Sequence, residues 1–186
     1  MRPTEELLQE HTAIRTMLGI LENACQQIDA GRSPNPAELG KILEFLKVFA
    51  DKCHHAKEEQ YLFPAMERAG VPKEQGPIGV MLAEHDLGRT YIGSMVKELE
   101  QYKSGEKTAL QKFARDARGY AQLLDQHIEK ENQVLFPLAD RILSREDLEH
   151  LSTDFERMEV EVIGPGRHEE FHAWLRELKQ VYPAQS

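Results

Sequence analysis

The strongest constraint on the fold is an internal repeat of two histidine-containing motifs. Glu-His-x-x-x-Arg occurs at residues 10–15 and again at residues 84–89. His-x-x-x-Glu-x-Gln-x-Leu-Phe-Pro follows at residues 54–64 and again at residues 127–137. The first histidines of the two motifs are 43 residues apart in the first half and 42 in the second. Two matches in the same order at nearly the same spacing predict a duplicated pair of helices.

The pattern of apolar residues is helical in the rest of the chain as well. Apolar residues recur at helical spacing in long segments, and no segment alternates apolar and polar residues for long enough to predict a strand. Loops containing glycine or proline separate these segments. The expected long helices cover about residues 4–30, 37–68, 77–102 and 107–142. Four long helices with short connections predict an all-α protein, an antiparallel up-down four-helix bundle.

Two shorter C-terminal helices are expected after the bundle. Ser144 has the chemistry of an N-cap for the first of them. Gly164-Pro165-Gly166 separates it from a last amphipathic helix. We therefore expect residues 1–142 to form the four-helix bundle domain and residues 143–186 to form a helical extension that packs on it.

Some local features of the long helices can also be predicted. Thr4, which precedes two acidic residues, is the expected N-cap of the first helix. The Phe-Pro pairs at residues 63–64 and 136–137 are expected to end the regular helical turn, because proline has no N–H group to donate. Cys25 and Cys53 are expected to be reduced thiols, with Cys53 packed in the core.

The charge balance excludes several classes of partner. The chain of 186 residues has 23 Lys and Arg against 32 Asp and Glu, a formal net charge of −9. Nucleic acids and anionic membranes attract a surplus of positive charge, so neither is an expected partner. No apolar run approaches the roughly 20 residues of a membrane-spanning helix. The N-terminal residues lack the apolar stretch of a signal peptide, so a cytoplasmic location is expected.

The second motif places a histidine and a glutamate four residues apart, on the same side of a helix and one turn apart. In a bundle, both such pairs would meet the histidines of the first motif in the interior. Burying these groups without partners would cost roughly several kcal/mol each, and bound metal ions remove that cost. Imidazole and carboxylate ligands favour iron or manganese over a structural zinc site. The expected metal ligands are His11, His54, Glu58, His85, His127 and Glu131.

One alternative within the second motif stays open from spacing alone. His55 and Glu59 also stand four residues apart. Aligning the shared Leu-Phe-Pro of the two halves favours His54 and Glu58, with His55 and Glu59 as the alternative pair.

Taken together, these motifs resemble the hemerythrin-like, or HHE cation-binding, family over about residues 5–140. The resemblance implies a four-helix bundle that holds a non-haem di-iron centre. It implies that Glu58 and Glu131 bridge two Fe ions together with a μ-oxo or hydroxo group, and that the four motif histidines are terminal ligands. Mn or Zn are expected substitutes for iron.

The sequence departs from the oxygen-carrying members of this family at two positions. Those proteins have His-x-x-x-His on the third helix, whereas Arg89 follows His85 here, and they have an aspartate where Glu131 stands. The expected centre therefore has two histidines for each ion and keeps positions for a small diatomic or peroxide ligand. This argues against reversible oxygen carriage.

Three functions are compatible with such a centre. The first is a stress-response protein that binds or senses O₂, NO or peroxide. The second is a di-iron enzyme with catalase-like or NO-reducing activity, the latter with a separate redox partner. The third is an iron reservoir or gauge. Relatives that repair iron–sulfur clusters share the His/Glu pattern, usually with an additional N-terminal domain. The sequence does not define the oligomeric state.

The remaining histidines and arginines have simpler interpretations. Arg15 and Arg89 are either partners of buried carboxylates or members of exposed ion pairs. His168 and His172 are expected on the surface of the extension, with a surface metal site or the missing ligand as alternatives. His150 and the acidic run from Glu156 to Glu161 are expected to face solvent.

Overall fold

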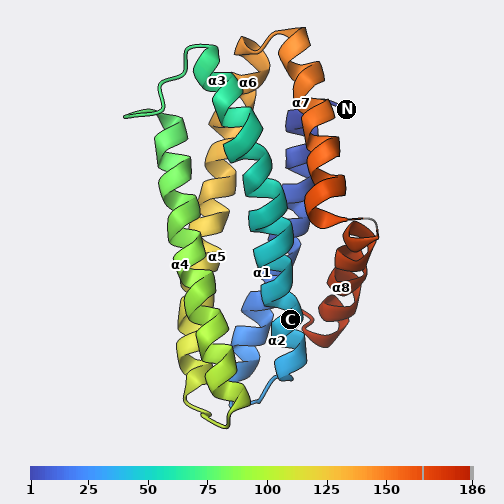
Figure 1. The fold of residues 1–186 in the computed structure, drawn as a ribbon. Coiled ribbons are helices and arrows are strands. Elements are labelled where there is room, and N and C mark those ends of the chain that lie inside the picture. Colours follow the sequence, from blue (N-terminus) through green and yellow to red (C-terminus); the bar gives the residue numbers. More distant parts are fainter. Residues whose placement is uncertain (165, 185–186) are drawn as a thin grey trace.

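The structure is a computed structural model that describes residues 1–164 and 166–184. Every regular element in these residues is a helix, and four long helices run antiparallel, side by side (Figure 1). The first is α1 (Pro3–Asp29), and the third is α4 (Pro77–Lys103). The predicted all-α fold with a helical bundle is confirmed.

The second and fourth long helices each change their hydrogen-bonding pattern along their length. The second consists of α2 (Pro36–Phe45), η1 (Leu46–His55), η2 (Glu58–Leu62) and α3 (Phe63–Arg68). The fourth consists of α5 (Ala109–Lys130), η3 (Glu131–Leu135) and α6 (Phe136–Ile142). The η segments are π-helices, which are rare and are frequently found at functional sites.

The extension comprises α7 (Arg145–Met158), η4 (Glu159–Ile163) and α8 (Arg167–Val181), which lie along one side of the bundle (Figure 1). Ser144 is the N-cap of α7 and forms a capping box with Asp147, as predicted. Phe171 of α8 is fully buried, with its ring centroid 5.6 Å from that of Phe45. Pro165 lies outside the described residues. The division of the chain at residue 142 stays a prediction.

The apolar core consists of two clusters, one toward each end of the bundle. Along α1, Leu7 belongs to one cluster and Ile14 to the other. Along the second long helix, Ala50 and Leu62 likewise belong to different clusters. Most of the buried polar residues lie between these positions, so the core is interrupted by a polar layer near the middle of the bundle.

The start of α1 differs from the prediction. The helix begins at Pro3, with Arg2 as its N-cap, so the assignment of Thr4 as the N-cap was wrong. Pro3 occupies the first helical position, where its fixed φ and missing N–H group carry no penalty. Thr4 is buried instead, and its hydroxyl donates a hydrogen bond of 2.7 Å to Asp140, which joins α1 to α6.

The Phe-Pro pairs also behave differently from the prediction, because the helices continue through both of them. Pro64 and Pro137 lie in the first turn of α3 and α6, and each follows a five-residue π-helical segment. A proline removes one backbone donor and its ring crowds the preceding turn. The wider π turn upstream accommodates this defect, and the chain then returns to an α-helix.

Away from the polar layer, Glu98 of α4 makes stability depend on pH. The residue is 7% exposed, and its Oε2 has no hydrogen-bond partner in the described residues. Burial, together with nearby Asp116, raises the pKa of Glu98 to about 7. The unfolded carboxyl has a pKa of about 4.3. The folded state therefore binds the proton of Glu98 more tightly than the unfolded state does. The contribution of this proton to stability is complete below about pH 4.3 and is lost as the pH rises through 7.

We expect Glu98→Gln to stabilise the protein by roughly 1–2 kcal/mol at pH 8 and by much less at pH 4.5. Urea unfolding of the variant and the wild type at both pH values measures this difference. Glu100→Gln, at an exposed position two residues along the same helix, is the control. An equal gain at the two pH values would show that the charge of Glu98 is not the cause.

Candidate metal centre

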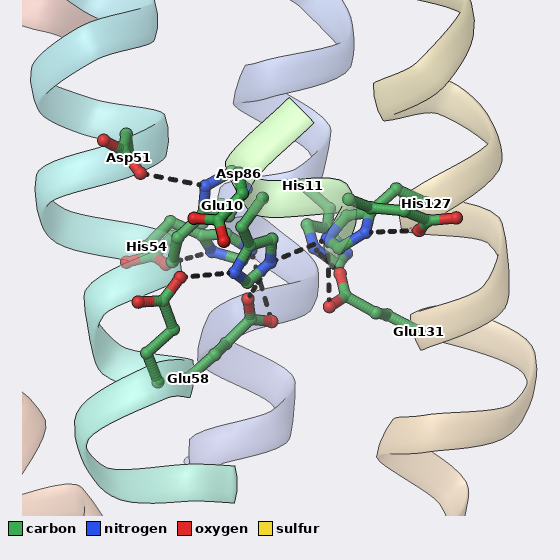
Figure 2. Close-up of polar contacts among 12 residues, drawn as sticks. Glu10, His11, Asp51, His54, Glu58, Asp86, His127 and Glu131 are labelled. Atoms are coloured by element: carbon green, nitrogen blue, oxygen red, sulfur yellow. Dashed lines mark hydrogen bonds and ion pairs between the residues drawn. The ribbon is translucent and has the colours of Figure 1, made fainter. Parts of the chain in front are cut away.

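All six side chains predicted as metal ligands meet in the polar layer of the bundle. Each of them is at most 2% exposed. Figure 2 shows His11, His54, Glu58, His127 and Glu131 directed toward one another from facing helices. The six residues come from all four long helices: His11 from α1, His54 from η1, Glu58 from η2, His85 from α4, His127 from α5 and Glu131 from η3.

The local sequence explains where the two glutamates lie. Glu58 and Glu131 are each the first residue of a π-helical segment that runs up to the Phe-Pro pair. The wide turn that precedes Pro64 and Pro137 therefore begins at the carboxylate itself. The repeated Leu-Phe-Pro is thus part of the backbone that holds each glutamate, not only a core contact.

Each glutamate directs its two oxygens toward two different histidines. In Glu58, Oε1 lies 3.6 Å from Nε2 of His54, and Oε2 lies 3.4 Å from Nε2 of His85. In Glu131, Oε2 lies 3.2 Å from Nε2 of His11, and Oε1 lies 3.1 Å from Nε2 of His127. Each carboxylate therefore lies between two pairs of imidazoles: it contacts one ring of the pair His11 and His54 and one ring of the pair His85 and His127. His11 and His54 with both glutamates form one group of side chains that could hold a metal ion, and His85 and His127 with the same glutamates form another.

The unpartnered atoms in this cluster fit such ions. Within the described residues, Nε2 of His11, Nε2 of His54 and all four oxygens of Glu58 and Glu131 have no hydrogen-bond partner. Nitrogen and oxygen ligands bind first-row metal ions at about 2.0–2.2 Å. Two ligands of one ion are then about 3 Å apart, which is close to the separations of 3.1–3.6 Å observed here.

A second set of residues fixes the orientation of the four imidazoles. In each ring, Nδ1 is bonded to a side-chain oxygen, which leaves Nε2 facing the centre. The bonds are His11 to Asn132 at 2.7 Å, His54 to Glu10 at 2.7 Å, His85 to Glu59 at 2.7 Å and His127 to Glu84 at 2.9 Å.

Glu10 and Glu84 are the glutamates of the repeated Glu-His motif. Each glutamate binds the histidine of the second motif, on another helix, and not the histidine beside it in the sequence. The repeat indicated that this glutamate matters, because it occurs in both copies of the first motif. Which histidine the glutamate binds depends on how the helices pack against each other.

The structure favours His54 and Glu58 over His55 and Glu59 as the ligand pair. The Glu59 carboxylate binds Nδ1 of His85 and lies outside the cluster. The ring of His55 is stacked on that of His85, with centroids 3.9 Å apart and planes inclined by 15°. An ion in the plane of one stacked ring lies well out of the plane of the other, so the two rings do not bind one ion together.

The charges of the cluster are strongly coupled. Burial and the nearby Glu131 raise the pKa of Glu58 well above its usual value. Burial opposes ionisation of Glu131 too, but His127 and His11 hold its pKa well below the usual value. Burial lowers the pKa of His54 well below its normal value. Metal binding requires neutral imidazoles and ionised carboxylates, so it displaces protons from this cluster.

Sequence reasoning missed a buried lysine beside the centre. Lys57 is fully buried, and its Nζ lies 2.6 Å from Glu6, 2.5 Å from Glu10 and 2.9 Å from Glu159. Since Glu10 also binds His54, a chain of hydrogen bonds connects the extension to a proposed ligand. The acidic run that contains Glu159 is therefore not entirely a solvated face.

A signal for this lysine was present in the repeat. Lys57 precedes Glu58, and Lys130 precedes Glu131 at the same position of the second motif. Lys130 binds Glu84, as Lys57 binds Glu10. A Lys–Glu–His connection thus occurs in both halves of the bundle.

The two arginines of the first motif differ. Arg15 pairs with Asp125 and Glu129 at the surface. Arg89 binds Glu59 at 2.7 Å and Asp51 at 2.9 Å, so it supports the carboxylate that orients His85. The motif position is the same, but only the second arginine reaches the proposed centre.

The other singled-out side chains lie outside the cluster. His168 and His172 pack near Phe49, and His168 lies 4.0 Å from Glu159. Side-chain atoms of His168, Glu159 and Glu10 all lie within 4.8 Å of one another, so this group could hold a metal ion. His150 is exposed. Cys25 and Cys53 are buried free thiols, and burial raises the pKa of both to about 12.

Comparison with known sequences assigns this chain to a family. The sequence model of the hemerythrin HHE cation-binding domain matches residues 2–139. The chain belongs to the hemerythrin HHE cation-binding family. The matched region contains both repeats, the first three long helices and the fourth up to residue 139.

The similar proteins are longer than this chain. An uncharacterised protein of Mycobacterium tuberculosis is 26% identical over 161 residues, which cover 86% of this chain and 62% of that protein. The iron-sulfur cluster repair protein YtfE of Yersinia pestis is 37% identical over 108 residues, which cover 56% of this chain and 46% of that protein. No solved structure gives a significant match. Among the described residues, no helix combines the length and apolar character needed to cross a membrane.

Proposed function

We propose that this hemerythrin-family protein holds two iron ions and uses them to bind or sense O₂, NO or peroxide in a stress response. The observation that carries the proposal is the division of each carboxylate of Glu58 and Glu131 between two histidine pairs. When bound, iron supplies redox chemistry and coordination positions for a small ligand. The similarity to an iron-sulfur cluster repair protein supports a role in stress.

The residues of the chain have separate roles in this proposal. His11 and His54 would hold one ion, and His85 and His127 would hold the other. Glu58 and Glu131 would contribute a carboxylate to both and neutralise part of their charge. The Nδ1 partners fix each imidazole, and the two apolar clusters restrict access of water to the centre.

We expect protein produced with ample iron to contain two iron ions per chain, with manganese or zinc replacing iron only when iron is scarce. Elemental analysis and Mössbauer spectroscopy measure this directly. Addition of NO or O₂ to the reduced protein is expected to change its absorption spectrum. A single zinc ion, or no metal at all with ample iron, would contradict the di-iron proposal.

A catalase-like enzyme is the second candidate, because peroxide disproportionation needs no redox partner. Sustained peroxide turnover that is lost in Glu58→Ala and retained in Glu100→Ala would favour the enzyme. Ligand-induced spectral changes without turnover would favour the sensor.

A further inference from the structure

We propose that a cavity beside His85 binds a small organic hydroxyl compound, either an alcohol or an alkyl hydroperoxide with an apolar body. The inference rests on the proposed function, because it extends the ligands of the centre beyond diatomic molecules and hydrogen peroxide.

The cavity lies between η1 and α4 and has a volume of about 290 Å³. A cavity of about 150 Å³ is enough to hold benzene, so this one has room for a ligand with a single ring. Its lining includes Asp51, His55, His85, Gly88, Ile92 and Tyr120. His85 is a proposed metal ligand, so a bound molecule would lie directly beside the centre.

Two buried polar groups of the lining have unused hydrogen-bonding capacity. Tyr120 is 2% exposed, and its hydroxyl makes no hydrogen bond within the described part of the chain. His55 is 3% exposed; its Nδ1 lies 3.3 Å from Oδ1 of Asp51, and its Nε2 has no hydrogen-bond partner among the described residues. Both residues line a space that is large enough for a ligand.

The hydrogen bonds of these groups define what they can recognise. The Asp51 carboxylate lies 3.3 Å from Nδ1 of His55 and 2.9 Å from Nε of Arg89. An ionised carboxylate only accepts hydrogen bonds, so Nδ1 of His55 is the donor and Nε2 is left as an acceptor. Burial raises the pKa of Tyr120, so its hydroxyl remains a donor. One donor beside one acceptor is complementary to an O–H group.

The walls and the rim favour a neutral ligand with an apolar body. Ile92 and Val96 provide an apolar wall, and the absence of a side chain at Gly88 leaves space near His85. Arg89 is at the rim, but its guanidinium is already bound by Asp51 and Glu59. Its charge is therefore compensated. Lys47, the other cation of the lining, is exposed to solvent, where its charge is screened.

The first test measures binding of benzyl alcohol to the iron-loaded full chain by calorimetry and NMR. We expect binding at one site and an about tenfold weaker affinity in Tyr120→Phe, the size of one lost hydrogen bond. Toluene, which has no hydroxyl group, is expected to bind wild type and Tyr120→Phe equally. No binding of benzyl alcohol, or an unchanged affinity in Tyr120→Phe, would overturn the proposal.

A second variant tests the location of the site. A Cβ at Gly88 would lie 3.5 Å from the Tyr120 ring, an ordinary contact, so Gly88→Val is expected to fold and to fill the cavity. It should abolish binding of benzyl alcohol and leave the iron content unchanged. Gly19→Val, at a position with nothing within 4 Å, is the matched control and should bind normally. Normal binding in Gly88→Val would overturn the location.

Cumene hydroperoxide distinguishes the two classes of hydroxyl ligand. Oxidation of the reduced protein by this compound, inhibited competitively by benzyl alcohol, would identify a hydroperoxide site. Binding of benzyl alcohol without such inhibition would identify an alcohol site. Wild-type protein that holds two irons but binds no benzyl alcohol would overturn this inference alone. Wild-type protein that binds benzyl alcohol but no iron would overturn the proposed function alone.

Discussion

Glu58→Met is expected to lose iron and, when metal-free, to be more stable than the wild type. Loss of a partner that only orients a ligand typically reduces metal affinity about 10–100-fold, so loss of Glu58, a proposed ligand of both ions, should exceed that range. In the metal-free protein, both oxygens of Glu58 are buried without a hydrogen-bond partner among the described residues. Replacing this carboxyl with an apolar side chain of similar length should therefore add about 1–3 kcal/mol of stability.

The two effects of Glu58→Met have opposite signs, and this distinguishes a metal ligand from a structural residue. Iron content after growth with ample iron measures the first effect. Urea unfolding of chelator-treated wild type and variant measures the second. Glu100→Met, at an exposed position of α4, is the control and should change neither quantity appreciably. A variant that retained two irons would show that Glu58 is not a bridging ligand.

Lys57→Met is expected to destabilise the protein by about 3–5 kcal/mol, the usual effect of removing one partner from a buried ion pair. The lysine is fully buried among the carboxylates of Glu6, Glu10 and Glu159. Burial alone would favour the neutral amine, but Glu10 and the other acidic groups raise the pKa of Lys57 well above its normal value. Without this lysine, three carboxylates would face one another without a counter-charge.

The repeat provides a matched control for this variant. Lys130 occupies the same motif position and binds Glu84, but its side chain is 42% exposed. Lys130→Met is therefore expected to cost less than about 1 kcal/mol. Urea unfolding of both variants measures the difference. Adding Glu159→Gln to Lys57→Met should recover part of the lost stability, because it removes one of the unpaired charges. Equal effects of the two lysine variants would contradict this account.

The residues brought together in the centre were largely predictable, because the relevant information is local. A histidine and a glutamate four residues apart lie on one side of a helix whatever the helix packs against. The internal repeat selected His54 and Glu58 over the neighbouring pair, and the structure places Glu59 outside the cluster. Two local predictions were wrong. The first helix begins at Pro3 and not after Thr4, and the helices continue through both Phe-Pro pairs because a π-helical segment precedes each of them.

The sequence by itself determined four long helices and the side of each helix that carries imidazoles and carboxylates, since periodicity along a helix defines its faces. Only the tertiary structure decided how these faces combine. It divides each carboxylate between two histidine pairs, and it orients His54 through Glu10 of another helix. It also makes Lys57 and Lys130 different despite their identical motif positions. The extension covers Lys57 with Phe155 and Glu159, and burial depends on what packs over a residue.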